Sequence, residues 1–289
     1  MAVQDKYITL GGHRHRFIEK GSSEHTMLLV HGISSSLDFY EQVIPHLSRS
    51  FRVIAFDLLG FGLSEKPRGK VYSLELYASL IREFLIKTGS LDDKLSAIGH
   101  SMGGKYLIAS ELIDPGTYSS LVLSNTDGFI HVPFFARGIS LPGVRRVLKK
   151  IITSENVSEK MFASAFHDTK KVNEDSYKKN LGIARDPEAF DTVMALNRNL
   201  PKLDLNRTGL RRRIGEIKVP VLVIWGDNDR FFSPSVAESV RNEIPLSTLV
   251  MFEECGHAPM LEYPEKFTRT VTDFILSDPY SRRDHADNL

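Results

Sequence analysis

A serine between two glycines, placed where an apolar run passes into a helical one, constrains the fold of this chain more than any other feature. The sequence Gly-His-Ser-Met-Gly, centred on Ser101, joins an expected strand over residues 95–99 to an expected helix over residues 102–113. A sharp strand-to-helix turn needs very small side chains, or none, at the positions two residues before and two residues after its central residue. Glycine occupies both positions here. Such a turn aims the serine hydroxyl away from the sheet, beside the free N–H groups that open the helix.

Compact apolar runs alternate with helical segments along most of the chain. Runs without a polar face are typical of parallel strands that helices bury on both sides. The alternation therefore predicts an α/β fold with a mostly parallel, eight-stranded sheet flanked by helices. The expected strands are 6–10, 14–19, 27–30, 52–56, 95–99, 121–124, 219–225 and 248–252, and the expected helices of this part are 37–47, 74–87, 102–113, 234–244 and 264–276.

The alternation breaks once, between about residues 127 and 218. Amphipathic helical segments follow one another there, over 144–152, 158–166 and 187–200. We therefore expect an inserted helical cap over residues 128–216, on a core made of residues 1–127 and 217–289.

The composition narrows the classes of partner. The 289 residues include 37 Lys and Arg and 36 Asp and Glu, and a net charge of +1 provides no field that would attract nucleic acid or an anionic membrane. We expect a small-molecule partner, with neither nucleic acid nor membrane, and the sequence carries no signal for an oligomeric state. The single cysteine, Cys255, excludes an internal disulfide framework, and no apolar run approaches the roughly 20 residues that cross a bilayer. These features favour a soluble, cytoplasmic protein.

An acid and a base follow two later apolar runs. Asp229 comes after residues 219–225, and His257 comes after residues 248–252. Parallel strands end at one edge of a sheet, so both loops should converge on the turn at Ser101. A serine nucleophile needs a base, and the base needs an acid to orient it. Asp127 and Asp227 also follow expected strands, and they remain alternatives for the acid.

Two further motifs complete a recognisable set. His31-Gly32-Ile33 follows the run 27–30, and the glycine-rich stretch 57–64 follows the run 52–56. Together with the serine turn and the loops around Asp229 and His257, these motifs resemble those of α/β-hydrolase-fold serine hydrolases, in particular the cap-bearing esterases. The resemblance covers residues 7–276, and the order Ser, Asp, His is the one that this family uses.

The resemblance implies acyl transfer through a covalent intermediate, with no metal and no cofactor. His257 takes the proton of Ser101, Asp229 orients the imidazole, and the backbone N–H groups of Ile33 and Met102 form the oxyanion hole. The implied substrates are carboxylic esters of small to medium apolar acids, so the expected partner is a small-molecule ester. We expect these side chains to wall the substrate pocket: Phe129, Phe134, Phe135, Met194, Phe231 and Met260.

Two other functions remain open. Hydrolases that cleave a C–C bond in ring-fission diketo acids resemble this chain in fold, length and cap, and cap arginines such as Arg185 and Arg198 could hold a carboxylate. That subgroup usually has asparagine before the serine and an aromatic residue after the histidine, whereas His100 and Ala258 stand here. From another class, the chain could be a ligand-binding sensor that retains a hydrolase triad. Dehalogenases and epoxide hydrolases of this fold use an aspartate nucleophile, and the serine argues against both.

Overall fold

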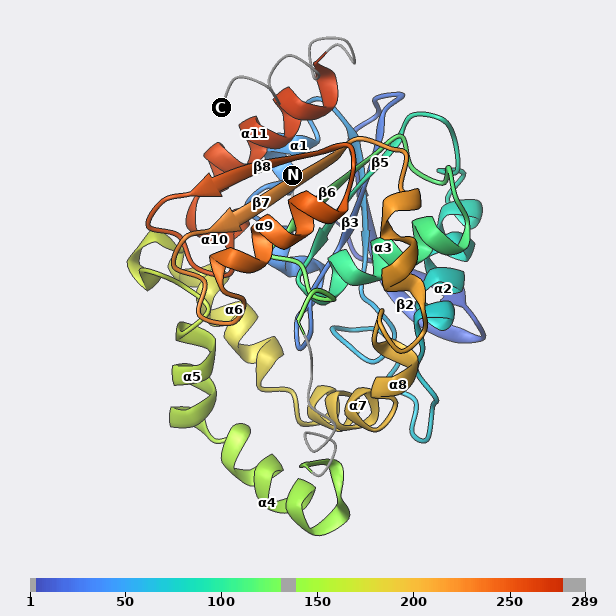
Figure 1. Ribbon diagram of the computed structural model, residues 1–289. Coiled ribbons are helices and arrows are strands. Elements are labelled where there is room, and N and C mark those ends of the chain that lie inside the picture. Colours follow the sequence, from blue (N-terminus) through green and yellow to red (C-terminus); the bar gives the residue numbers. More distant parts are fainter. Residues whose placement is uncertain (1–3, 131–138, 278–289) are drawn as a thin grey trace.

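An eight-stranded sheet forms the centre of the molecule, which a computed structural model describes over residues 4–130 and 139–277 (Figure 1). The strand order is β1-β2-β4-β3-β5-β6-β7-β8, in which β2 pairs antiparallel with β1 and β4 and all the other pairs are parallel. The predicted α/β fold with a mostly parallel sheet is confirmed. The strands are β1 Lys6–Leu10, β2 His13–Lys20, β3 Thr26–Val30, β4 Arg52–Phe56, β5 Leu95–His100, β6 Ser120–Ser124, β7 Val221–Gly226 and β8 Ser247–Phe252.

The central strands are apolar on both faces because helices cover both faces. Successive residues of one strand enter opposite cores: Leu28 belongs to one buried cluster and Leu29 to the other. The first core packs against α2 (Leu74–Lys87), α3 (Met102–Ile113) and α9 (Pro234–Glu243). The second packs against α1 (Ile44–Leu47), α10 (Pro259–Glu262) and α11 (Pro264–Leu276). This layering fixes the strand ends, and therefore the loops that follow them.

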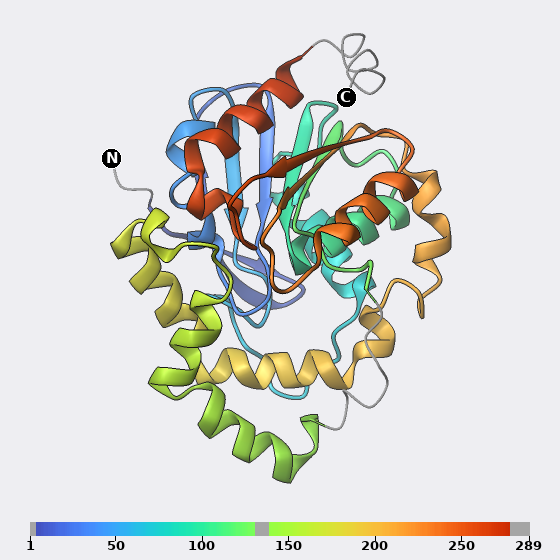
Figure 2. The same ribbon diagram turned by 60° about the vertical axis from the view of Figure 1, so that its left-hand side comes forward.

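The segment between β6 and β7 holds a separate group of helices. Figures 1 and 2 show α4 to α8 gathered beyond the carboxyl ends of the strands. Side-chain caps begin two of these helices, since Asn173 accepts the N–H of Ser176 and Asp186 accepts the N–H of Glu188.

The division of the chain into a core and an inserted cap, with boundaries at residues 127 and 217, stays a prediction. The elements are α4 Pro142–Ile152, α5 Glu155–Ala163, η3 Thr169–Lys171, α6 Glu174–Ala184, α7 Pro187–Arg198, α8 Leu200–Leu203 and η4 Leu210–Glu216.

Several predicted elements differ from the observed ones. The single helix expected over 37–47 is wrong: a short 3-10 turn, η1 (Leu37–Tyr40), ends before α1 begins, and Pro45 lies in the first turn of α1. The helix expected over 158–166 lies at Glu155–Ala163, and the one expected over 187–200 ends at Arg198 before α8 begins. Among the helices of residues 4–130 and 139–277, none combines the length and hydropathy needed to traverse a lipid bilayer.

Candidate active site

Ser101 occupies the turn between β5 and α3. Its backbone takes φ 52° and ψ −120°, a conformation that residues with a side chain rarely adopt. A Cβ added to Gly99 would lie 2.5 Å from the Cα of Gly104. A Cβ added to Gly103 would lie 2.2 Å from the carbonyl oxygen of Val30, so the turn and the first turn of the helix both depend on bare positions. The strand-to-helix turn expected around this serine is present.

The loop after β3 passes directly over Ser101. A Cβ on Gly32 would lie 3.1 Å from the Cβ of Ser101, closer than ordinary van der Waals contact. His31 holds this loop from within the core, because its Nε2 accepts the N–H of Leu58 at 2.9 Å and its Nδ1–H donates to the carbonyl oxygen of Gly32 at 2.8 Å. Burial lowers the pKa of His31 to about 4, so the ring stays neutral, and its two hydrogen bonds fix the tautomer.

Two backbone N–H groups flank the serine. Met102 is the first residue of α3, and Ile33 follows Gly32 in the loop above. Within the described part of the chain, neither N–H donates a hydrogen bond to a protein acceptor. Both residues line the cavity that opens at Ser101, so both N–H groups are candidates to bind an oxyanion there.

His257 and Asp229 form a hydrogen-bonded pair at the ends of β8 and β7. Nδ1 of the imidazole lies 2.7 Å from Oδ2 of the carboxylate, whose side chain is 0% exposed. An ionised carboxylate only accepts, so Nδ1 carries the proton and Nε2 is left as a proton acceptor. The rings of Phe231 and Phe232 pack against the imidazole in T-shaped contacts, with ring centroids 5.1 and 5.2 Å away.

The carboxylate of Asp229 is held on all sides. Its Oδ1 accepts the N–H groups of Phe231 at 2.8 Å and Phe232 at 3.1 Å, and its Oδ2 also accepts Nδ2 of Asn125 at 2.8 Å. Burial alone would raise the pKa of Asp229, but the hydrogen bond from His257 and these donors outweigh it, and the pKa lies below its usual value. Asp229 therefore stays ionised and can orient the imidazole at neutral pH.

The two alternative acids lie elsewhere in the hydrogen-bond network. Asp127 forms an ion pair with Lys105. Asp227 accepts hydrogen bonds from its own turn and from the loop after β8. Neither carboxylate hydrogen-bonds to His257 in the described residues, so the geometry favours Asp229 as the orienting acid.

His100 joins the serine turn to the histidine loop. Its Nε2–H donates to the carbonyl oxygen of His257 at 2.8 Å, and the two rings lie 4.8 Å apart. Burial lowers the pKa of His100 to about 3, so the ring stays neutral. Because Ser101 is the next residue, this contact brings the serine and His257 to one rim of the sheet. No hydrogen bond joins the Ser101 hydroxyl to the His257 imidazole among the described side chains; such contacts commonly tighten only when substrate binds.

A cavity of about 290 Å³ opens at Ser101. Its walls come from the core and from α7 and α8, so helices inserted between β6 and β7 form part of the site. These helices lie beyond the sheet in the lower part of Figure 2. Most of the wall is apolar, and besides Ser101 four charged or amide side chains of the described residues interrupt it: Lys105, Asp127, Asn197 and Asp204. The apolar wall consists of Ile33, Met102, Tyr106, Ile130, Ile139, Val193, Leu196, Leu200, Leu203, Leu205 and Phe232.

Four of the six side chains predicted as pocket walls do not line this cavity. Met260 is fully buried in the second core, and Met194 is buried in α7. Phe129 packs under the guanidinium of Arg211, 4.1 Å from its ring centre. Phe231 lies at the edge of the site, 48% exposed against His257. The corrections for Met260, Met194 and Phe129 share a cause, because hydrophobicity in the sequence marks burial and does not distinguish a core from a pocket. Phe134 and Phe135 fall outside the described residues.

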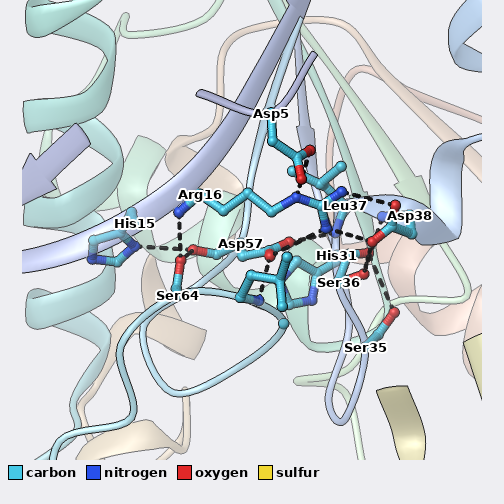
Figure 3. Close-up of polar contacts among 12 residues, drawn as sticks. Asp5, His15, Arg16, His31, Ser35, Ser36, Leu37, Asp38, Asp57 and Ser64 are labelled. Atoms are coloured by element: carbon cyan, nitrogen blue, oxygen red, sulfur yellow. Dashed lines mark hydrogen bonds and ion pairs between the residues drawn. The ribbon is translucent and has the colours of Figure 1, made fainter. Parts of the chain in front are cut away.

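A buried charged cluster lies behind the loop after β3 (Figure 3). Arg16 on β2 donates to both carboxylate oxygens of Asp38, with Nη2 3.0 Å from Oδ1, and its Nη1 lies 3.6 Å from Oδ2 of Asp57. Asp57 follows β4 and accepts the backbone N–H groups of Leu37 at 2.8 Å and Leu63 at 2.7 Å. Burial raises the pKa of Asp57 to about 6. The cluster thus fixes the loops that follow two neighbouring strands.

The same cluster reaches the inserted helices through Lys179 of α6. Its Nζ lies 2.6 Å from Oδ1 of Asp38 and 2.9 Å from Oε2 of Glu41. Burial alone would raise the pKa of Asp38, but its hydrogen bonds from Arg16 and Lys179 lower it to about 2. The carboxylate therefore stays charged, and it ties α6 to the core.

Sequence reasoning missed two residues that hold the acid and base loops. Asn125 binds the carboxylate of Asp229, and its only sequence signal is its position directly after an expected strand. Glu262 accepts the N–H of Gly256 at 2.6 Å and the N–H of His167 at 3.0 Å, so it joins the histidine loop to the segment after α5. Nothing in the sequence near Glu262 distinguishes it from a solvated helix residue.

Comparison with known proteins places this architecture in a family. Residues 25–264 match the α/β hydrolase fold family. A protein of Pseudomonas putida named 2-hydroxy-6-oxononadienedioate/2-hydroxy-6-oxononatrienedioate hydrolase 1 is 30% identical over 283 residues, which are 94% of each chain. Lipase 1 of Psychrobacter immobilis is 27% identical, over 90% of this chain and 80% of its own.

A solved structure repeats the fold over nearly the whole chain. The crystal structure of the esterase RhEst1 from Rhodococcus sp. ECU1013 has a TM-score of 0.77, covers 96% of this chain and 99% of its own, and is 20% identical. At that identity the likeness shows the fold alone.

Proposed function

The chain belongs to the α/β hydrolase fold family, and on that premise we propose that it is a serine hydrolase that cleaves carboxylic esters of small to medium, mainly apolar acids. The observation that carries the proposal is the hydrogen-bonded His257–Asp229 pair, which His100 joins to the strained Ser101. Ser101 itself lines a largely apolar cavity. The predicted partner is a small-molecule ester, and the predicted location is the cytoplasm.

The proposed mechanism follows from the atoms at the site. Nε2 of His257 takes the proton of Ser101 as Oγ attacks the ester carbonyl. The negative oxygen that forms accepts hydrogen bonds from the N–H groups of Ile33 and Met102, each of which contributes roughly a hundredfold to a thousandfold in rate. His257 then gives its proton to the departing alcohol, and a water molecule repeats both steps to release the acid from the serine.

Cleavage of a C–C bond is the second candidate, and the Pseudomonas putida relative and its name support it. Two local features favour the ester instead. Arg185 is engaged with α5, where its Nε donates to the hydroxyl of Ser158 at 2.7 Å, and neither Arg185 nor Arg198 lines the cavity. The residues beside the serine and the histidine, His100 and Ala258, also differ from those usual in that subgroup.

The direct test removes the nucleophile. We expect Ser101→Ala to lower the rate of p-nitrophenyl butyrate hydrolysis by at least about a thousandfold, because no other group can form the acyl intermediate. The circular dichroism spectrum and the midpoint of urea unfolding should stay close to those of the wild type. An active Ser101→Ala variant would refute the proposal.

The same assay separates the proposal from its competitors. Asp229→Asn should cost more activity than Asp127→Asn, and the reverse order would make Asp127 the acid. A graded ester panel, run beside a ring-fission diketo acid, decides between ester and C–C hydrolysis. A sensor would react once with a serine-directed phosphonate and hydrolyse activated esters only a few times, whereas an esterase turns over continuously.

A further inference from the structure

One ion pair faces the largely apolar cavity. Lys105 lies in the first turn of α3, four residues after Ser101, and is only 9% exposed. Its Nζ pairs with Oδ2 of Asp127, which follows β6, and Oδ1 of Asp127 accepts the N–H of Gly128 at 2.6 Å. Both side chains line the cavity together with Ser101. The catalytic steps described above use neither of them.

A contribution to the stability of the fold does not explain why this ion pair lies in an apolar cavity. Lysine is rarely buried unless it is paired, and the cost of removing two charges from water commonly equals or exceeds their attraction. An apolar pair of similar volume would suit the surrounding wall of Tyr106, Leu203 and Leu205 at least as well. The position of the pair inside the substrate cavity points to contact with a ligand.

We propose that Lys105 and Asp127 form a polar subsite that selects esters whose acyl chain carries an uncharged oxygen, as a hydroxyl or keto group. This inference rests on the proposed ester hydrolysis and names its substrate class. A lysine ammonium has three N–H donors, of which Asp127 takes one, so another can donate to a keto or hydroxyl oxygen. A hydroxyl can in addition donate its own proton to Asp127.

The helix places this subsite at a defined distance from the reacting carbonyl. Side chains of an α-helix lean toward its N-terminus, so the Lys105 side chain extends back over the turn that begins at Ser101. Four residues of helix span about 6 Å along the axis. Because Ser101 and Lys105 line one cavity, a single acyl chain that is attacked at Ser101 can also reach the ammonium of Lys105.

The charges of the wall argue against an anionic acyl chain. The carboxylates of Asp127 and Asp204 both face the cavity, and Lys105 is its one Lys or Arg side chain among the described residues. Asp204 accepts the backbone N–H of Asn206 at 2.8 Å, and its Oδ2 lies 4.0 Å from Nε of Arg207. A carboxylate on the substrate would meet Lys105 only beside the carboxylate of Asp127 and would be repelled by it, whereas an uncharged oxygen meets a free donor without that repulsion.

The test compares acyl chains of equal length in the wild-type protein. The series begins with methyl heptanoate and includes its keto and hydroxy analogues, in which the added oxygen is moved along the chain one carbon at a time. The monomethyl ester of heptanedioic acid is the anionic member. Each ester is hydrolysed at constant pH, and kcat/KM is measured from the release of acid. We expect the best oxygenated ester to exceed methyl heptanoate by about tenfold or more, since hydrogen bonds to charged groups are among the strongest. The anionic ester should be the poorest of the series.

The variants separate recognition from structure. Lys105→Met should lower the ratio of kcat/KM between oxygenated and plain esters by about tenfold, and using the ratio cancels any general loss of activity. The double variant Lys105→Met/Asp127→Asn should lower the same ratio without leaving a buried carboxylate unpaired, so it serves if the single variant folds poorly. Lys202→Met is the matched control, because Lys202 is an exposed lysine on the nearby α8 and should leave the ratio unchanged.

Each outcome has one meaning. A wild-type ratio near one, or a ratio that survives in both Lys105 variants, overturns the subsite while ester hydrolysis stands. A preference for the anionic ester that Lys105→Met abolishes overturns the uncharged class. Failure of the wild type to hydrolyse any ester of the series, plain or oxygenated, refutes the proposed function itself.

Discussion

Backbone strain in this molecule is concentrated at single residues of the site. Within the described ranges, four non-glycine residues have positive φ: Ser34, Ser101, Asn125 and Glu254. Each lies in a loop that follows a different strand of the sheet. Ser34 flanks the candidate oxyanion loop, Ser101 is the candidate nucleophile, Asn125 binds Asp229, and Glu254 precedes His257 in its loop. Strain of this kind persists only where the surroundings enforce it, so the cores hold these loops in place.

Buried neutral histidines predict how stability depends on pH. Burial lowers the pKa of His31 to about 4 and that of His100 to about 3, whereas the unfolded chain titrates near 6.5. Below pH 6.5 the unfolded chain therefore binds protons that the folded chain excludes, and the free energy of unfolding should fall as the pH falls toward 4. Each such histidine contributes up to about 1.4 kcal/mol per pH unit. The raised pKa of Asp57 acts in the opposite direction between its usual value and about 6, and it offsets part of this loss.

The measurement compares the wild type with His100→Asn, which keeps an N–H donor but has no titrating ring. Urea unfolding at several pH values between about 4 and 6.5 gives the slope of stability against pH for each protein. We expect a shallower slope in the variant, whatever its absolute stability. Parallel slopes would show that His100 titrates alike in the folded and unfolded chains.

At the scale of elements, the strands were predictable and several short helices were not. The strands were recognisable in the sequence because both faces are buried, so nearly every residue is apolar, as in Val221–Gly226. The helix α6 was not predicted, because its sequence mixes charged residues with few apolar ones. The helix α10 has only four residues, too few to show a period.

The site was predictable in its motif residues and not in their supports. The serine turn requires glycine at fixed spacing, and the acid and base must follow strands, so sequence order alone points to Ser101, Asp229 and His257. Asn125, Glu262 and the cavity walls depend on which loops and helices pack together across the sheet. These contacts join residues that are far apart in the sequence, so the spacing of residues within one motif does not predict them.

The close approach of α3 to β3 gives a test of packing between elements. A Cβ on Gly103 would meet the carbonyl oxygens of Val30 at 2.2 Å and His31 at 2.6 Å, and backbone atoms cannot move aside as a flexible side chain can. We expect Gly103→Ala to lower the free energy of unfolding by about 1–3 kcal/mol or more. Gly182→Ala in α6 is the matched control, since nothing lies near its Cβ position, and it should raise stability by about 0.5–1 kcal/mol. Equal urea midpoints for the two variants would contradict this packing.

At the scale of the whole molecule, the inserted helices and the core share contacts that converge on the site. The N–H of His257 donates to the carbonyl oxygen of Ala165 at 2.6 Å, next to the end of α5. Glu262 accepts the N–H of His167, and Lys179 binds Asp38. Both sides of the site, the histidine loop and the loop after β3, are therefore held partly by the insertion. A change in how α5 and α6 dock should reach catalysis through these contacts.

The buried cluster of Figure 3 gives the last prediction, because it joins β2, two loops and α6. Arg16→Met leaves the carboxylates of Asp38 and Asp57 buried without their guanidinium, and the free energy of unfolding should fall by about 3–5 kcal/mol. Arg14→Met on the same strand is the control: its guanidinium stacks 3.5 Å from the ring centre of Tyr7 at the surface, and its loss should cost no more than about 1 kcal/mol. Urea unfolding of both variants measures the difference. Similar losses would mean that water or Lys179 compensates the two carboxylates, and that the cluster does not hold the site together.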